Sequence, residues 1–420
     1  MGFALRPITP GIPCRLAGYA TVRPAEGVAD ELYARALALD GADGLIVILQ
    51  LDVLCVDELF IGLVEERLKV TGIKRDDLLV FCSHTHSSFG GIFDVSDSLN
   101  AQLVELFGEA NPGLLDMLAE SSAQVITEAI GNKRETGVCI LKDTIIGVAT
   151  NRHSPEELCD RDILVVDFQR DDGKRVLLYN LSCHPTVLDK NNKLLSADFT
   201  GYAGKYLSGH CDMSVFINGS AGDMSTRFVR RESSFDECGR IGGIIGEKVL
   251  EMLTAEQQYA PLESVSLTYH NLSLKQAVMD DPYEAERKLR TTEENLRAVM
   301  AGTDDPSLIR KAQSYVEGAS INLMRSRGSQ AGRLSEVPVR VGILTLNGNK
   351  IVCSPFELFS TLALLLKSRT QAEMFGYANA YRGYLADVRA YESMEYEALF
   401  SDFAAGQGEV YIEKVLELLQ

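Results

Sequence analysis

The sequence is short of histidine, with only six in 420 residues, and it contains no run of basic residues. Acidic residues number 59 and basic residues 41, so the formal net charge is −18. A chain this acidic, without a Lys/Arg-rich stretch, is not expected to bind nucleic acid. Because histidines are scarce, any histidines that cluster become informative.

Long hydrophobic segments are missing as well. The longest apolar run, residues 44–56, is interrupted by Gln50 and Asp52, so it is too short and too polar to span a bilayer. The first residues show neither the apolar core nor the cleavage site of a secretory signal. The nine cysteines form no Cys-x-x-Cys pair, and several lie in apolar runs, as reduced buried thiols do. We therefore expect a cytoplasmic protein with no membrane span.

What the sequence does contain is an alternation of short Val/Ile/Leu-rich runs with amphipathic segments, which is typical of an α/β protein. Strands are expected at residues 44–56, 78–83, 137–141, 163–168, 176–182, 213–218, 265–272, 337–346 and 350–353. Helices are expected at residues 57–71, 114–130, 235–253, 282–300, 306–324 and 356–368. No repeat or linker divides the chain, so residues 1–420 are expected to form a single domain with a helical insertion at about 282–327.

Two histidines follow the expected strand at residues 78–83. His84 and His86 are separated by one residue, so on an extended backbone both side chains face the same side. Such a pair can combine a metal ligand with a second active-site histidine, although an isolated His-x-His is as often a surface pair. Its position at a strand end, where sites are commonly built, favours the functional interpretation.

A third histidine, His184, comes directly after the expected strand at residues 176–182. A lone histidine there is usually a buried residue bonded to a carbonyl. Because two strand ends both run into histidine in a histidine-poor chain, a shared metal site is favoured.

The loop after the expected strand at residues 213–218 is rich in small residues, which let backbone amides approach a carbonyl oxygen or an oxyanion. It is not a P-loop, because no Gly-Lys-Ser/Thr follows, and it is not a Gly-x-Ser-x-Gly elbow. From spacing alone a plain turn is equally compatible.

Taken in order, three motifs resemble the signatures of the neutral/alkaline non-lysosomal ceramidase family. They are His84-Thr85-His86-Ser87, Cys183-His184-Pro185-Thr186 and Gly222-Asp223-Met224-Ser225. Residues 32–36, 151–155, 355–358 and 379–384 are also similar to family segments, so the resemblance runs from about residue 15 to the C-terminus. It implies the family's catalytic-domain fold, a mixed β-sheet core flanked by helices, without the C-terminal immunoglobulin-like domain of larger members.

The resemblance also implies a metal centre. It assigns one Zn²⁺ per chain to His84, His184, Glu357 and Tyr381, a plausible set of nitrogen and oxygen ligands. Spacing alone would not select the last two. Glu357 could equally be a carboxylate at a helix start, and Tyr381 is one of fifteen tyrosines.

The predicted activity is zinc-dependent hydrolysis of an N-acyl amide bond in a small-molecule substrate. Zinc would activate water and polarise the acyl carbonyl. His86 would transfer protons, and Ser225 would act as nucleophile or stabiliser; the sequence does not choose between these two roles. The expected substrate-binding residues are Arg152, Gly222, Asp223 and Arg227.

Other interpretations stay open at this point. Arg227 stands where the family has a neutral residue, which favours an acidic or otherwise polar N-acyl substrate over ceramide and over a role in sphingolipid metabolism. A TIM-barrel amidohydrolase would need further metal histidines, which His210 and His270 do not convincingly supply. A non-catalytic metal- or ligand-binding protein of the same fold is a further alternative, as is a hydrolase of another amide or ester.

Overall fold

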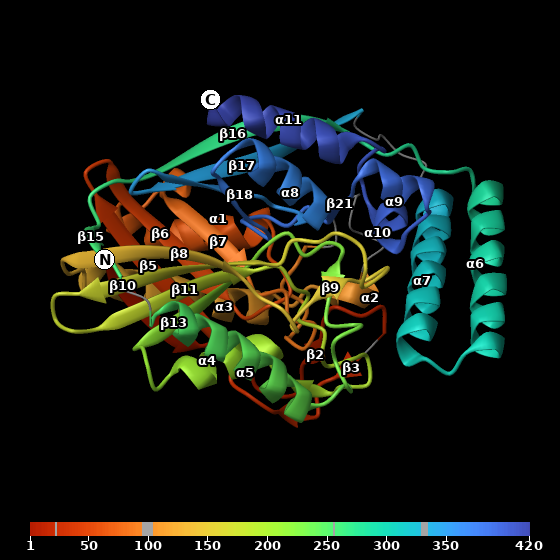
Figure 1. Cartoon of the computed structure of the whole chain (residues 1–420), viewed down its shortest axis with the longest axis horizontal. Coiled ribbons are helices and arrows are strands. Elements are labelled where there is room, and N and C mark those ends of the chain that lie inside the picture. Colours follow the sequence, from red (N-terminus) through yellow and green to blue (C-terminus); the bar gives the residue numbers. More distant parts are fainter. Residues whose placement is uncertain (22, 95–103, 255–256, 329–334) are drawn as a thin grey trace.

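The computed structural model describes residues 1–21, 23–94, 104–254, 257–328 and 335–420 (Figure 1). The first sheet has the strand order β1-β5-β6-β7, with β6 and β7 parallel and the other pairs antiparallel. Its strands are β1 (Gly2–Pro7), β5 (Tyr33–Gly41), β6 (Gly44–Leu51) and β7 (Leu78–Cys82). Strand β6 is covered on both faces, because Val47 and Leu49 lie in one core cluster and Ile46 and Ile48 in another, which explains its unbroken hydrophobic sequence.

The second sheet has the order β13-β11-β10-β8-β15, with β11 and β13 parallel. Its strands are β8 (Thr136–Thr144), β10 (Asp162–Arg170), β11 (Arg175–Leu181), β13 (Met213–Asn218) and β15 (Ala260–Pro261). Alternate residues of β10 face opposite clusters, since Leu164 and Val166 point to the central core and Ile163 and Val165 to the outer one.

Helices cover the outer faces of these two sheets, which gives the layer order helix, sheet, sheet, helix. The outer face of the first sheet packs against α1 (Glu58–Leu68) and α3 (Pro112–Gly131), and that of the second against α4 (Phe199–Leu207) and α5 (Phe235–Met252). Each helix buries an apolar stripe, as in α5, where Ile241, Ile245 and Val249 recur at helical spacing. One central cluster joins the inner faces of both sheets.

A third sheet extends this core, with the order β16-β17-β18-β20. It consists of β16 (Val265–Lys275), β17 (Glu336–Leu346), β18 (Asn349–Cys353) and β20 (Glu373–Phe375), and it is covered by α8 (Ser360–Arg369) and α11 (Gln407–Leu419). Between β16 and β17 the chain forms α6 (Pro282–Gly302) and α7 (Pro306–Gly328), which pack side by side at the edge of the molecule (Figure 1). Helix α7 also packs against α10 (Tyr396–Phe400).

Shorter elements complete the described chain. They are β2 (Arg15–Leu16), β3 (Arg23–Pro24), β4 (Gly27–Val28), α2 (Val104–Phe107), β9 (Thr150–Asn151), β12 (Leu194–Leu195), β14 (Met224–Ser225), β19 (Glu357–Leu358), β21 (Tyr384–Leu385), α9 (Val388–Glu392) and the 3₁₀ turns Lys69–Thr71 and Arg75–Asp77.

The expected α/β class with a mixed β-sheet core is confirmed, and open sheets replace the closed parallel barrel that a TIM-barrel enzyme would need. The expected helix at residues 356–368 begins too early. Glu357 and Leu358 form β19, parallel to β21, and the helix starts only at Ser360. Tertiary pairing explains the difference, since the Glu357 amide donates to Gly383 and the Gly222 amide donates to Leu358. Among the helices of the described residues, none is long and apolar enough to cross a bilayer.

Candidate metal centre and active site

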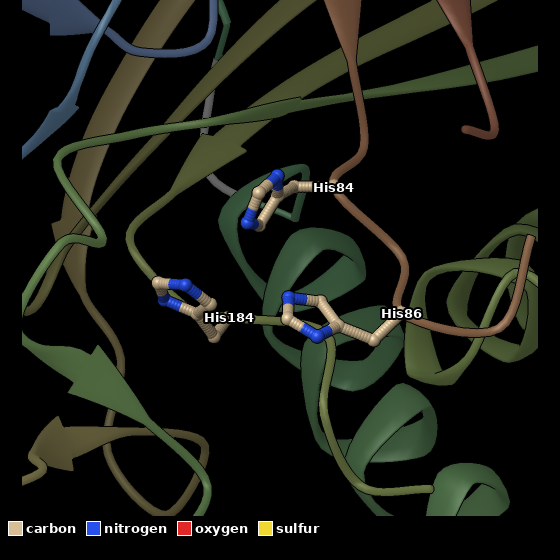
Figure 2. A group of neighbouring side chains, drawn as sticks. All are labelled: His84, His86 and His184. Atoms are coloured by element: carbon tan, nitrogen blue, oxygen red, sulfur yellow. The ribbon is translucent and has the colours of Figure 1, made fainter. Parts of the chain in front are cut away.

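Three histidines from two strand ends converge on one space (Figure 2). His84 and His86 follow β7, and His184 follows β11. Ring centroids lie 5.0 Å apart for His84 and His86, 5.0 Å for His84 and His184, and 5.8 Å for His86 and His184. One nitrogen of each ring lies within 4.8 Å of the others, a spacing that suits a metal ion.

Glu357 reaches the same space from β19, more than 170 residues further along the chain than His184. Its Oε2 atom lies 2.7 Å from Nε2 of His184 and 3.4 Å from Nε2 of His84. The hydroxyl of Tyr381 donates to the other carboxylate oxygen, Oε1. All four residues that the resemblance assigned to zinc are therefore neighbours.

The hydrogen bonds of the two histidines fix their tautomers. Nδ1 of His84 faces the carbonyl of Leu54 at 2.9 Å, and Nδ1 of His184 faces the carbonyl of Ala221 at 2.6 Å. A carbonyl can only accept, so each Nδ1 carries a proton, and a neutral ring of this tautomer has its lone pair at Nε2. Burial, with the charge of Arg152, lowers the pKa of His184 to about 4, which keeps that ring neutral near pH 7.

When both rings are neutral, two imidazole lone pairs and one carboxylate oxygen face one another, and no donor of the described residues lies between them. Acceptors so arranged repel unless a cation joins them, and backbone carbonyls that orient the ligating histidines are the usual support of a metal centre. The residues present therefore fit a zinc ion.

Backbone strain is concentrated around the centre. His84, Tyr377 and Asn379 are non-glycine residues with φ of 67°, 55° and 58°. The Tyr377 ring lies 4.5 Å from that of His84, and Asn379 is held by two hydrogen bonds to the backbone of Val80 in β7. Such conformations cost about 1–3 kcal/mol each and are found mainly at functional sites.

His86 differs from the other two histidines. Both of its ring nitrogens are buried, and neither has a hydrogen-bond partner among the described residues. The ring packs edge-on against Tyr19 at 5.0 Å. Burial, reinforced by His84 and His184, holds its pKa well below the usual range. A neutral imidazole with unused nitrogens is available to a ligand or to a proton in transfer.

Ser225 lies next to this cluster on β14. Its backbone forms a parallel bridge with that of His184, and the His184 amide donates to the carbonyl of Met224 at 3.1 Å. The Ser225 hydroxyl accepts from the amide of Arg227 at 3.3 Å and has no acceptor of its own among the described residues. It is therefore free to donate to a ligand.

Gly222 and Asp223 connect this loop to the Glu357 segment. Oδ1 of Asp223 accepts from the amide of Ser360 at 2.7 Å, and Oδ2 accepts from the Ser360 hydroxyl at 2.8 Å and from Asn151 at 3.0 Å. Burial raises the pKa of Asp223 to about 6. A Cβ on Gly222 would lie 2.5 Å from the carbonyl oxygen of Glu357, so only glycine fits there. Direct substrate contact by either residue stays a prediction.

Arg152 is held in place by partners that the sequence did not reveal. Its Nε lies 2.5 Å from Glu397, and Nη2 donates to the carbonyl of Gly222 and, at 3.1 Å, to the hydroxyl of Tyr384. That hydroxyl lies 3.5 Å from Nε2 of His184. Tyr384 falls inside the family-like segment 379–384 and could have been singled out there, whereas no sequence signal indicates Glu397.

His153 forms a second buried group with two carboxylates. Its Nε2 lies 2.9 Å from Glu397 and 3.3 Å from Glu395. Burial raises the pKa of Glu395 to about 7. Glu397 of this group is already paired with Arg152, so the group has a cation of its own.

The histidine–carboxylate centre thus lies beside a buried serine in a layered α/β fold. A sequence model described as neutral/alkaline non-lysosomal ceramidase, N-terminal, matches residues 2–229, and the chain belongs to this family. The resemblance seen in the motifs is thus confirmed.

Solved structures share the fold. A structure described as a ceramidase complexed with C2 aligns with a TM-score of 0.74 at 16% identity, over 98% of this chain and 73% of that chain. The neutral ceramidase of Pseudomonas aeruginosa aligns with a TM-score of 0.74 at 17% identity, over 98% and 72%. A comparison with curated protein sequences gives no match.

Proposed function

We propose that this protein hydrolyses the N-acyl amide bond of a small-molecule substrate, with one zinc ion held by His84, His184, Glu357 and Tyr381. The observation that carries the proposal is the meeting of two Nε2 lone pairs with the carboxylate of Glu357, 2.7 and 3.4 Å away. When bound, zinc supplies Lewis acidity, which polarises an acyl carbonyl and lowers the pKa of water.

The protein's own side chains divide the remaining work. His86, with two unpaired ring nitrogens, takes up a proton from the attacking group and returns it to the leaving amine. Ser225, whose hydroxyl proton has no acceptor among the described residues, either hydrogen-bonds the attacking water and the intermediate or attacks the acyl carbon itself. Arg152 holds the carbonyl of Gly222 and the hydroxyl of Tyr384 in place beside His184. The hydroxyl of Tyr381 orients Glu357 by donating a hydrogen bond to Oε1 of that carboxylate.

A non-catalytic binding protein of this fold is the second candidate. In such a protein the unpaired nitrogens of His86 would bind the ligand or the metal without transferring a proton. His86→Ala would then weaken binding, whereas in the proposed hydrolase it lowers turnover and leaves the zinc content unchanged.

The test is an amidase screen on purified protein, first stripped by a chelator and then reloaded with zinc. N-acyl amines, N-acyl amino acids, short-chain ceramides and matching esters would be incubated with it, and the released amine or alcohol measured. We expect amide hydrolysis only in the zinc-loaded protein. His86→Ala should lower the rate about 10²–10⁴-fold. His270→Ala, a half-buried histidine on β16, is the matched control and should not. If every amide stays intact after zinc loading, the proposal fails.

A further inference from the structure

Three guanidinium groups surround the candidate site, and each is held by backbone carbonyls of the site's own segments. Arg23 donates to the carbonyl of His86 at 2.7 Å, and Arg227 donates to that of Arg152 at 2.6 Å. Arg230 donates to that of Thr186, two residues after His184, at 2.5 Å. The backbone that carries the candidate metal and catalytic side chains thus also orients three positive charges.

None of these three arginines has a carboxylate at ion-pair distance among the described residues. This is notable because the chain carries a net charge of −18 and its other arginines near the site are paired, Arg152 with Glu397 and Arg310 with Glu317. Arg227 is only 8% exposed. Burial, together with the charges of Arg152, Arg310 and Arg230, lowers the pKa of Arg227 to about 9. An unpaired cation in such a position costs stability.

Some N–H donors of the Arg227 and Arg230 guanidinium groups form no hydrogen bond with the described residues. Arg227 and Arg230 each use only Nη1, so the other N–H groups of both forks are free of hydrogen bonds to the described residues. A guanidinium edge matches a carboxylate or a phosphate through two parallel hydrogen bonds. The backbone of Arg227 lies next to the proposed reacting group, since its amide donates to the Ser225 hydroxyl at 3.3 Å.

Helix α7 encloses the same region. The hydroxyl of Ser307 donates to the carbonyl of Arg227 at 3.0 Å, and Lys311 donates to the carbonyl of His153 at 2.5 Å. These bonds tie α7 to the loops that carry Arg152 and Arg227, so the arginines are fixed before a ligand arrives. Preorganised charges lose little entropy on binding.

We infer that the substrate is an anionic amide, whose carboxylate or phosphate binds to Arg227 and Arg230 beside Ser225. This inference rests on the proposed amide hydrolysis and narrows its substrate class. A neutral amide would leave the two guanidinium edges without a partner. An anionic amide supplies the negative charge that no carboxylate of the described residues provides to Arg227 and Arg230.

The experiment compares three amides with the same acyl chain: an N-acylglycine, an N-acylethanolamine phosphate and a neutral N-acylethanolamine. For each we would measure kcat/KM and, by calorimetry, binding to the zinc-loaded protein. We expect the better of the two anionic amides to exceed the neutral one by at least about tenfold. If the N-acylglycine is the better substrate, the arginines recognise a carboxylate; if the N-acylethanolamine phosphate is better, they recognise a phosphate.

Substitutions then test whether Arg227 and Arg230 cause the preference for anionic over neutral amides. Arg227→Gln should lower the anionic-to-neutral ratio about 10–100-fold, mainly through KM, and Arg230→Gln should act in the same direction. Arg227→Lys, which keeps the charge but loses the fork, should recover part of the ratio. The matched control is Arg290→Gln, an exposed arginine on α6 that forms no ion pair with the described residues, which should leave the ratio unchanged. Thermal unfolding of each variant shows that it is folded.

The possible failures are distinct. If the neutral amide is hydrolysed best, or if Arg227→Gln and Arg230→Gln affect all three amides equally, the anionic inference is overturned and the amidase proposal stands. If no amide is hydrolysed, calorimetry still decides. Selective binding of an anionic amide that Arg227→Gln abolishes supports the inference without the activity, and equal binding of all three overturns it.

Discussion

The histidine centre and the arginine cluster lie side by side and are built alike, yet they call for opposite charges. In the centre, carbonyls of Leu54 and Ala221 fix the tautomers of His84 and His184, so that lone pairs face the carboxylate of Glu357. In the cluster, carbonyls hold Arg227 and Arg230 without neutralising them. The first arrangement suits a cation and the second suits an anion. We therefore expect the chemistry to depend on the centre, and the choice of substrate to depend on the arginines.

The largest effect should come from removing a ligand of the centre. His184→Ala should abolish zinc binding and lower the activity at least about 1,000-fold, because Lewis-acid stabilisation worth several kcal/mol is lost. Metal content by mass spectrometry and turnover would be measured together. Full zinc occupancy in this variant would mean that the ligands have been misassigned.

Ser225→Ala should distinguish the role of the metal from that of the serine hydroxyl. We expect zinc content to be unchanged and kcat to fall about 10²–10³-fold, since the hydroxyl acts only on the substrate. Ser208→Ala is a useful control, because that serine is exposed at the C-terminal end of α4 and is not one of the proposed site residues. Native turnover by the Ser225 variant would remove the serine from the mechanism.

Arg152 lies near the arginine cluster but is paired with Glu397, so breaking this ion pair should lower the free energy of unfolding. Burial alone would raise the pKa of Glu397, but Arg152 and His153 outweigh it and lower the pKa from 4.5 to about 2. A depressed carboxyl pKa stabilises the fold fully above about pH 4.5, and that stabilisation is lost as pH falls toward 2. Glu397→Gln should thus cost roughly 3 kcal/mol at pH 7 and much less at pH 3.

Denaturant unfolding of native and Glu397→Gln protein at both pH values would measure this difference. Glu413→Gln, an exposed pair with Arg369, is the control and should change stability by less than about 1 kcal/mol. A penalty for Glu397→Gln that grows on acidification would contradict the assigned ion pair.

Tyr384 bridges the two regions, and its loss should have the smallest effect. Its hydroxyl accepts from Arg152 at 3.1 Å and lies 3.5 Å from Nε2 of His184. Tyr384→Phe keeps the ring and should lower kcat about tenfold, as supporting residues of metal centres do. Tyr206→Phe, an exposed tyrosine of α4, should be silent in the same assay. If both variants behave alike, Tyr384 supports only packing.

The sequence predicted elements well where local pattern decides. The strand at 213–218 matches β13 residue for residue, and the helices at 235–253 and 282–300 match α5 and α6 to within two residues. It failed at Glu357, where a helix-like pattern is overridden by pairing of β19 with β21. Strand β1 was not expected at all, because its six residues show no periodicity strong enough to mark it.

The site could be predicted only in part for the same reason. His84, His86 and His184 follow strands and are rare residues, so local sequence marks them. Glu357 and Tyr381 came from the family resemblance, since nothing local says that they meet the histidines. Glu397 pairs with Arg152 across more than 240 positions, a contact that no local pattern encodes.

The most direct test of the account is zinc K-edge X-ray absorption on the zinc-loaded protein, with metal content determined on the same sample. Cys82 and Cys183 are buried thiols that precede His84 and His184 by two positions and one position, so a sulfur-ligated site is the clear alternative. The account predicts about one zinc per chain, coordinated by two imidazoles and by oxygen, with metal–ligand distances of about 2.0–2.2 Å and no sulfur. A sulfur shell near about 2.3 Å, two zinc ions per chain, or none would contradict it.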